Sequence, residues 1–445
     1  MEMDADALVL RVGAAARSEA AELLPGRLAL AVSGGADSCA MAALICEAGL
    51  AVRGSVAAHF DHRLRGEEAA ARDLAAVAAL CARYGLELEA GAWARPRRGE
   101  AAAREARYAF LRGAAQRHGA AAIATGHTSD DQVETVLLHA LRGAGLSGLR
   151  GMRPVDALPG GGTALLRPLL GVTRAETRGF CAARGIAFED DETNGDLSLL
   201  RNRVRLELLP RLESMAPDAR GAILRLADEA RAGVAALEEI ASKALLDDAA
   251  GAAEVRLWRE GLRGLPEAAR PYAYRLALRR LLGDAQDFDR RHYALMARAA
   301  AATTGSAYEL PRGVVLTVDA EVLVLSRGQP GAPAIAPSWE AAVPYAGTAG
   351  AWEIAVTPAQ DAAAEAIALP AGAVVRGRRA GDRIAPAGMA GHKKLQDYYV
   401  DRKVPRRERD AAPLLACGGD VLWTPFGAAR AVEGARYAVS ARRHP

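Results

Sequence analysis

Short apolar runs alternate with longer amphipathic stretches through the first two hundred residues of this 445-residue chain. The clearest apolar runs predict strands at residues 28–32, 54–59, 86–90 and 121–125. Each run is followed by a helical pattern, at residues 39–48, 67–84, 100–118 and 131–141. This order predicts an α/β fold with a doubly wound parallel sheet, in which ligands bind at the carboxyl ends of the strands.

The pattern changes after residue 212, which we take as the end of an N-terminal catalytic domain over residues 1–212. Residues 213–328 read as helix throughout from about 215 to 300 and end in a hairpin at 306–325, so they predict a mainly helical middle domain. A Gly- and Pro-rich stretch opens residues 329–369, which predict a linker and the start of the C-terminal region. Residues 370–445 predict a small α+β domain.

The net charge of +3 is unevenly distributed, because residues 371–445 hold 15 lysines and arginines against 7 acidic residues. A basic module of this kind favours binding of a polyanion such as RNA. The alternative is a basic face that only contacts solvent. Five cysteines without a Cys-x-x-Cys pair or metal-ligand spacing favour a reducing, cytoplasmic setting. We expect neither a membrane anchor nor an export signal, because no uncharged apolar run reaches membrane-spanning length.

A glycine turn joins the first predicted strand to the first helix. Both glycines can adopt positive φ, and their backbone N–H groups, with the N-terminus of the following helix, would surround an anion. No Gly-Lys-Ser/Thr follows, so the turn favours release of pyrophosphate from a nucleotide over phosphoryl transfer. A plain turn between a buried strand and a helix is the alternative. The turn consists of Ser33, Gly34, Gly35, Ala36, Asp37 and Ser38.

A second polar segment ends the second predicted strand and contains Asp61, His62 and Arg65. Beside a phosphate loop, the Asp or His would orient a ribose or a metal ion, and the arginine would neutralise phosphates. The alternative is an ordinary polar strand end.

A third segment follows the fourth strand and contains His127, Asp130, Asp131 and Glu134. Positions 127, 131 and 134 are three or four apart, so where they are helical they would project from one face toward the crevice. Their oxygens would suit Mg²⁺ bridging ATP phosphates, or would hold an incoming amine. Simple capping of the helix is the alternative for the two aspartates.

Two arginine pairs are candidates for guiding nucleic acid. Arg104 and Arg107 lie on the helix before the fourth strand, and Arg201 and Arg205 follow an acidic segment at 190–194. An exposed basic face and capping before a domain boundary are the respective alternatives.

Together these motifs closely resemble those of the tRNA(Ile)-lysidine synthases, members of the N-type ATP pyrophosphatase or PP-loop superfamily. The resemblance rests on the turn at 33–38, on the motifs at 59–65, 104–108, 126–135, 141–145, 167–170 and 191–203, and on C-terminal strings within 393–415. It implies that ATP adenylates the 2-carbonyl oxygen of the wobble cytidine in the CAU anticodon of tRNA(Ile) and releases pyrophosphate. The side-chain amine of L-lysine then displaces AMP to give lysidine. Thr128 departs from the histidine that relatives often carry and Phe60 from a smaller apolar residue, so we expect no catalytic role at position 128.

The resemblance also implies a role for each matching residue. Catalysis falls to Asp37, His127, Asp131 and Glu134. ATP binding falls to Ser33, Gly34, Gly35, Ala36, Asp37, Ser38, Asp61, His62 and Arg65. The lysine or base site contains Asp130, Asp131 and Glu134, and Mg²⁺ would be held by Asp37 and Asp131. Contacts to tRNA fall to Arg104, Arg107, Arg201, Arg205, Lys393, Lys394, Arg402, Lys403, Arg406 and Arg407. Tyr398 and Tyr399 could stack on bases or fill a core, and we expect the core. A homodimer stays open, because nothing in the sequence marks an apolar interface stripe.

Three alternatives stay open. A PP-loop tRNA thiolase would use paired cysteines to carry persulfide or an iron–sulfur cluster, and the sequence has no such pair. An amide-forming synthetase that uses ammonia would leave the basic C-terminal domain without a role. A non-catalytic tRNA-binding protein with a relic nucleotide fold would not need Asp37, Asp131 and Glu134.

Overall fold

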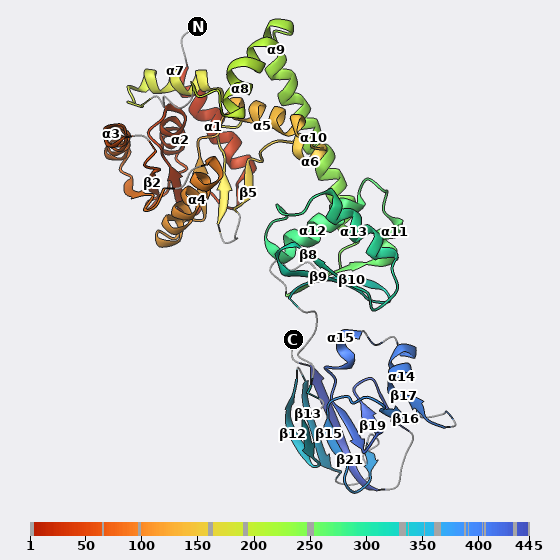
Figure 1. The fold of residues 1–445 in the computed structure, drawn as a ribbon. Helices are drawn as coiled ribbons and strands as arrows, with labels where there is room; N and C mark the ends of the chain where they lie inside the picture. The colour runs from red at the N-terminus through yellow and green to blue at the C-terminus, as the bar shows by residue number, and fades with distance from the viewer. Residues whose placement is uncertain are drawn as a thin grey trace. The chain divides into compact units, whose positions relative to one another are not determined.

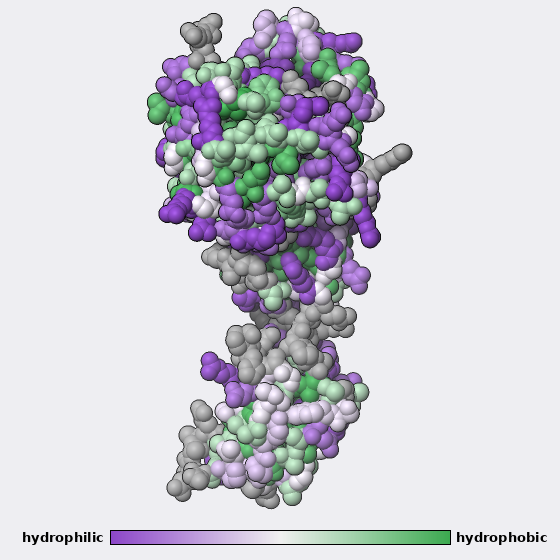
Figure 2. Space-filling view, turned by 90° about the vertical axis from the view of Figure 1, so that its left-hand side faces the viewer, coloured by the Kyte–Doolittle hydropathy of each residue, from purple (hydrophilic) through white to green (hydrophobic). Residues whose placement is uncertain are grey.

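The computed structural model divides into two compact units, Met1–Glu239 and Ile240–Pro445. None of the helices within the described ranges is long and apolar enough to cross a membrane. On the face shown in Figure 2, hydrophobic side chains of the N-terminal unit form small patches among hydrophilic ones. The structure describes residues 4–64, 66–96, 99–158, 163–189, 195–246, 253–328, 335–336, 338–350, 352–359, 366–386, 389, 391–402, 404, 406–429 and 434–443.

The N-terminal unit runs from red to green in Figure 1. Its sheet has six strands, in the order β3-β2-β1-β4-β6-β5. All neighbouring pairs are parallel except β5 with β6. The predicted parallel sheet is therefore confirmed except at β5, whose antiparallel pairing makes the sheet mixed. The predicted strands match β1 to β4 to within two residues at each end. The strands are β1 Leu28–Ala31, β2 Val56–Asp61, β3 Glu87–Ala92, β4 Ala122–Thr125, β5 Val155–Ala157 and β6 Ala164–Leu166.

Helices cover both faces of this sheet. Leu28 and Leu30 of β1 pack into a core with residues of α1, α2, α3 and α7, whereas Ala29 packs on the other face against Leu111 of α4. This division follows from the alternation of side chains along a strand. The helices are α1 Ala5–Glu19, α2 Ala36–Glu47, α3 Glu67–Tyr84, α4 Glu100–Arg117, α5 Ser129–Leu141, α6 Leu146–Leu149, α7 Arg174–Arg184, α8 Leu200–Arg203, the π-helical turn η2 Val204–Leu208, α9 Leu209–Met215 and α10 Ala219–Ser242.

The middle part of the chain contains a four-stranded sheet, β7-β10-β9-β8, besides its helices. The predicted hairpin is present, but the prediction of helix throughout 215–300 is wrong because β7 pairs antiparallel with β10. Val255 and Leu257 of β7 are buried. The elements are β7 Glu254–Trp258, α11 Arg259–Gly264, α12 Arg270–Leu282, α13 Arg290–Ala301, β8 Ala307–Leu310, the 3₁₀ turn η3 Pro311–Gly313, β9 Val314–Val318 and β10 Val322–Arg327.

The C-terminal part is built mainly from antiparallel strands in two sheets. It is thus richer in strand than the predicted α+β domain, and its first four strands lie inside the segment expected to include a linker. Tyr398 and Tyr399 are buried, which confirms their predicted place in a core. The elements are β11 Glu340–Ala342, β12 Tyr345–Ala349, β13 Trp352–Pro358, β14 Ile367–Leu369, β15 Val374–Arg376, β16 Arg383–Ile384, β17 Lys393–Lys394, α14 Leu395–Asp401, α15 Arg406–Arg409, β18 Leu414–Cys417, β19 Asp420–Thr424, β20 Gly427–Ala428 and β21 Ala435–Arg443.

Candidate active site

The predicted phosphate loop leads from β1 into the N-terminus of α2. Ser38 Oγ accepts a hydrogen bond from the backbone N–H of Ser33 (3.0 Å) and donates one to the carbonyl oxygen of Gly35 (2.9 Å). Gly34 has a φ of 98°, and a Cβ there would lie 3.0 Å from Cβ of Asp73, so position 34 requires glycine. Gly35 has an ordinary φ of −77° and caps α2, so only one of the two glycines uses the conformation that both could adopt.

A close backbone approach joins this loop to the third predicted motif. A Cβ on Gly126, between β4 and α5, would lie 2.8 Å from the carbonyl oxygen of Asp37 and 2.9 Å from the backbone nitrogen of Ser38. Glycine therefore lets the start of α5 pack directly against the start of α2. This contact brings the acidic residues of α5 next to the phosphate loop.

The α5 helix begins with a capping box. The backbone N–H of Thr128 donates to Oδ2 of Asp131 (2.9 Å), and the Thr128 side chain accepts from the N–H of Asp131. Asp131 therefore caps the N-terminus of α5, which is the alternative role that the sequence left open for it. His127 precedes the helix, so of the three positions only Asp131 and Glu134 are helical and can share a helical face.

His127 is held neutral. Burial is the main cause that lowers its pKa to about 3, and Arg167 and Arg107 lower it further, while Asp131 opposes them. Its Nδ1 lies 2.8 Å from Oγ1 of Thr125. At neutral pH the imidazole is therefore an uncharged hydrogen-bonding group.

Arg174, the first residue of α7, joins three of the predicted acidic residues. Its Nη1 donates to Oε1 of Glu134 (2.7 Å), its Nη2 donates to Oδ1 of Asp131 (2.5 Å), and its Nε lies 3.6 Å from Oδ2 of Asp37. One turn later, the Thr177 hydroxyl donates to Oδ1 of Asp37 (2.5 Å). The structure thus brings the phosphate loop and the α5 carboxylates together through the first turn of α7.

Sequence reasoning missed Arg174 and Thr177. A signal for the helix was present, because Thr173 and Glu176 form a capping box, the pattern that marks a helix start. That signal predicts where α7 begins but not which carboxylates it faces.

Glu134 is fully buried among arginines. Besides Arg174, it accepts hydrogen bonds from Nε of Arg201 (3.1 Å) and from Nε of Arg205 (2.7 Å). Arg201 and Arg205, which were predicted to contact tRNA, are therefore hydrogen-bonded to Glu134, which was predicted to be catalytic. Its neighbour Asp130 accepts from the backbone N–H of Arg174 (2.8 Å) and from Nη1 of Arg220 (2.7 Å).

The surroundings shift the two other carboxylates in opposite directions. Burial raises the pKa of Asp37 and outweighs the Thr177 hydrogen bond and the charge of Arg174. Burial would also raise the pKa of Asp131, but Arg174 and the Thr128 N–H outweigh it, so that pKa is lowered. Asp131 is therefore the more strongly ionised of the pair.

The side chains of the site could bind a magnesium ion only if a nucleotide supplied further ligands. Among the residues that the structure describes, no group of three or more His, Cys, Asp and Glu side chains is arranged to hold a metal. Both oxygens of Asp131 already accept hydrogen bonds, whereas Oδ2 of Asp37 has its nearest cation 3.6 Å away. Since Mg²⁺ is often bound by one or two carboxylates together with substrate phosphates, Asp37 is the better candidate ligand.

The second predicted motif lies at the end of β2. Oδ1 of Asp61 accepts from the backbone N–H of Arg63 (2.7 Å), and the His62 ring meets the edge of Phe60 at 5.0 Å between centroids. Arg65 lies outside the described residues. Their role in nucleotide binding stays a prediction.

The remaining arginines and lysines predicted to contact tRNA lie on α4 and in the C-terminal part. Arg104 and Arg107 both lie over the ring of Tyr108, at 4.9 and 5.2 Å from its centroid. Lys393 pairs with Asp401, Lys394 is exposed, and Arg402 lies over the Tyr398 ring. Lys403 and the side chains of Arg406 and Arg407 lie outside the described part of the chain.

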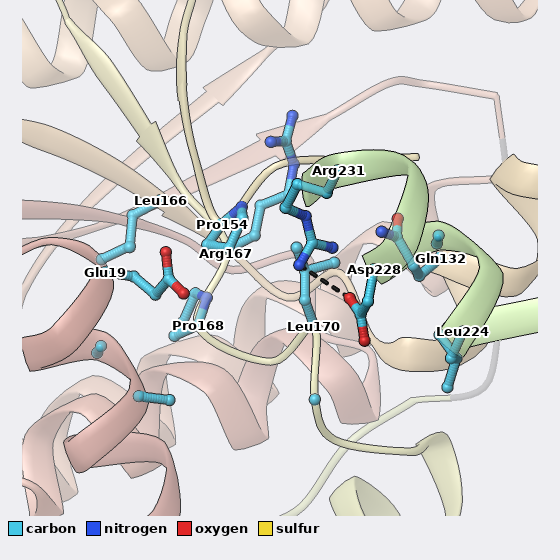
Figure 3. Close-up of a pocket in the computed structure, with 14 residues that line it drawn as sticks. Glu19, Gln132, Pro154, Leu166, Arg167, Pro168, Leu170, Leu224, Asp228 and Arg231 are labelled. Carbon is cyan, nitrogen blue, oxygen red and sulfur yellow. Dashed lines mark ion pairs between the residues drawn. The ribbon is translucent and has the colours of Figure 1, made fainter. Parts of the chain in front are cut away.

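A separate pocket of about 270 Å³ opens between α1, α5, α10 and the segment after β6 (Figure 3). Glu19, Gln132 and Arg167 contribute to its lining, and an ion pair between Arg231 and Asp228 (2.9 Å) lies at its wall. The predicted catalytic residues, all of which the structure describes, do not line it. The pocket is therefore distinct from the carboxylate–arginine network.

Two family models match the chain, a PP-loop domain at residues 14–212 and a TilS substrate C-terminal domain at residues 373–431. The chain is 37% identical over 349 residues to a tRNA(Ile)-lysidine synthase of Symbiobacterium thermophilum, covering 73% of this chain and 72% of that one. It is 34% identical over 358 residues to that of Dehalococcoides mccartyi, covering 73% of each. A solved TilS C-terminal domain is 28% identical with a TM-score of 0.17, covering 21% of this chain and 86% of that one. On these matches in sequence, the chain belongs to the tRNA(Ile)-lysidine synthase family.

Proposed function

We propose that the network centred on Arg174 is where this ATP-dependent tRNA(Ile)-lysidine synthase carries out both of its reactions. Family membership gives the overall activity: ATP and L-lysine convert the wobble cytidine of tRNA(Ile) to lysidine. The observation that carries the location is the direct contact of Asp37, in the phosphate loop, with the same guanidinium that binds Asp131 and Glu134. The loop for ATP and the carboxylates for an amine therefore share one crevice.

The first reaction needs activation of a poor leaving group. The 2-carbonyl oxygen of cytosine cannot depart alone, so its attack on the α-phosphate of ATP converts it to an ester of AMP and expels pyrophosphate. In this proposal the backbone N–H groups of residues 33–38 and the N-terminus of α2 hold the phosphates. Mg²⁺ would enter with ATP and be held by Asp37, where it would offset charge on the departing pyrophosphate.

The second reaction needs a neutral amine. Asp131 and Glu134 would bind the side-chain ammonium of L-lysine, with Asp130 beside them. The surrounding arginines lower the pKa of a nearby ammonium by charge repulsion, which favours the nucleophilic form. Asp131 is the proposed anchor of the ammonium, since its lowered pKa keeps it ionised and able to pair with the cation. The proton would pass to a carboxylate or histidine close to the adenylate. His127, which is neutral at working pH, would position the target cytosine by hydrogen bonding.

The target cytidine must leave the anticodon stack to reach this crevice, and a single-stranded loop permits this at low cost. We propose that Arg104 and Arg107, near His127, receive the phosphates beside the flipped base. The C-terminal residues Lys393, Lys394 and Arg402, with the nearby basic residues outside the described part, would hold tRNA phosphates elsewhere. A cytoplasmic location belongs to the proposal on the sequence argument alone.

The cysteines weigh against the thiolase alternative. All five are free, and burial raises the pKa of Cys39, Cys46 and Cys181 to about 12. Since the thiolate is the nucleophile in sulfur transfer, such thiols are unreactive at neutral pH. A ligase that uses an amine is consistent with this chemistry.

The proposal is tested with purified full-length protein, ATP, radiolabelled L-lysine and an unmodified tRNA(Ile) transcript. Label should enter the tRNA only with ATP present, and Asp37→Asn should abolish it. Glu207→Gln, at a half-exposed side chain outside the predicted site, should retain incorporation. Label that enters without ATP, or that survives in Asp37→Asn at the unmodified rate, would overturn the proposal.

A further inference from the structure

Arg174 occupies the carboxylates that the proposed function gives to lysine. Its Nη2 contacts Oδ1 of Asp131 at 2.5 Å and its Nη1 contacts Oε1 of Glu134 at 2.7 Å. An ammonium group at the same oxygens would meet a guanidinium within contact distance, and like charges repel. The lysine side chain and Arg174 therefore compete for one anionic site.

The same guanidinium also faces the phosphate loop. Nε of Arg174 lies 3.6 Å from Oδ2 of Asp37, within the loop that binds phosphates in the proposed function. The Arg174 side chain is 23% exposed, whereas Glu134 is fully buried, so solvent and a nucleotide can reach the arginine but not Glu134. Arginine binds phosphate in a planar two-point geometry at least as well as it binds carboxylate.

Glu134 does not depend on Arg174 alone. Arg201 and Arg205 also donate to it, and Asp131 keeps its hydrogen bonds from Thr128. Moving the Arg174 guanidinium toward a phosphate would leave both carboxylates oriented and would free Oδ1 of Asp131. Oε1 of Glu134 would keep its hydrogen bond from Nε of Arg205. The network thus has two arrangements that differ in which anion Arg174 holds.

We propose that Arg174 is a positioning residue that couples the two substrates: ATP phosphates draw its guanidinium from Asp131 and Glu134, and this opens the site for the lysine ammonium. The inference rests on the proposed function. It gives the reaction an order, because the amine site becomes available when the activating nucleotide is bound. By linkage, lysine must tighten nucleotide binding by the same factor.

The test is equilibrium dialysis of labelled L-lysine against the full chain, with saturating tRNA(Ile) transcript throughout. It is run with and without an ATP analogue whose α–β bridge is methylene, so that no adenylation occurs. For the unmodified protein the analogue should tighten lysine binding at least tenfold. Arg174→Gln should bind lysine without the analogue at least tenfold more tightly than the unmodified protein does, and the analogue should then change binding less than twofold.

A gain of binding separates this role from a structural one, because a damaged fold does not bind lysine more tightly. Arg178→Gln is the matched control: it lies one turn along α7, over the Phe188 ring at 5.3 Å, and should keep the tenfold coupling. Lysine affinity that ignores the analogue in the unmodified protein, or no gain in Arg174→Gln, would overturn the inference. Lysidine formation by the unmodified protein in a parallel turnover assay shows that the proposed function stands when the coupling fails; its absence would mean that the function itself fails.

Discussion

Replacing Glu134 with glutamine removes a negative charge that three guanidinium groups share. Glu134 has no exposed side-chain surface, and it accepts hydrogen bonds from Arg174, Arg201 and Arg205. Glutamine keeps the shape and one acceptor oxygen but not the charge. Because Arg174 retains its contact with Asp131, the loss falls mainly on Arg201 and Arg205.

The magnitude follows from the burial of the pair. Removing one partner of a buried ion pair costs about 3–5 kcal/mol, since the other charge stays desolvated. The retained amide places Glu134→Gln at the lower end, about 3 kcal/mol. For a domain of roughly 200 residues, each kcal/mol lowers the melting temperature by about 2–4 °C, so we expect a drop of about 6–12 °C.

The assay is scanning calorimetry, following the transition that an ATP analogue shifts upward. Glu207→Gln is the control, because Glu207 pairs with Arg203 at 3.5 Å but both side chains are about half exposed. Such a surface pair contributes under about 0.5 kcal/mol. A Glu134→Gln transition within 2 °C of the unmodified protein, or no different from that of Glu207→Gln, would refute the reasoning.

Three further predictions concern other positions. Gly126→Ala should weaken binding of an ATP analogue at least tenfold by titration calorimetry, because its Cβ would lie 2.8 Å from backbone of α2, whereas Gly145→Ala, where nothing lies within 4 Å, should not. The pKa of His127 is about 3 when folded and near 6.5 when unfolded, so the unfolded chain binds the proton first and stability falls as pH drops from 6.5 toward 3. We therefore expect the free energy of unfolding, measured by urea titration, to fall between pH 7 and pH 5 by about 2 kcal/mol less in His127→Asn than in the unmodified protein. Identical pH profiles of the two proteins would contradict this. Arg376→Met should cost about 3–5 kcal/mol in the same titrations, because it leaves the Asp382 carboxylate buried without its cation; a cost under 1 kcal/mol would contradict it.

Local patterns predicted the fold where one segment carries its own signal. The buried strands β1 to β4 appear as apolar runs, and the glycine turn at 33–38 marks the loop between strand and helix. β7 was missed because its five residues stand among strong helix formers, and its strand character depends on pairing with β10. Tertiary pairing here overrides the local propensity.

The sequence predicted the acidic residues of the candidate site but not the arginines that link them by ion pairs. Asp37, Asp131 and Glu134 stand out because each follows a strand end or a glycine turn. Arg174 follows neither a strand end nor a glycine turn. Its role depends on the fold, which brings the start of α7 to the carboxylates of α5 and α2. The position of Arg201 and Arg205 after an acidic segment marked them as candidates for nucleic-acid contact, but did not show that both turn inward to Glu134.

The most direct test of the account is the chemical identity of the wobble nucleoside after reaction. Unmodified tRNA(Ile) transcript is incubated with the protein, ATP and L-lysine, digested to nucleosides and measured by mass spectrometry alongside the nucleotide products. The account predicts lysidine in place of the wobble cytidine, with one AMP and one pyrophosphate formed per modified base. An unchanged cytidine, or ADP and phosphate as the nucleotide products, would contradict it.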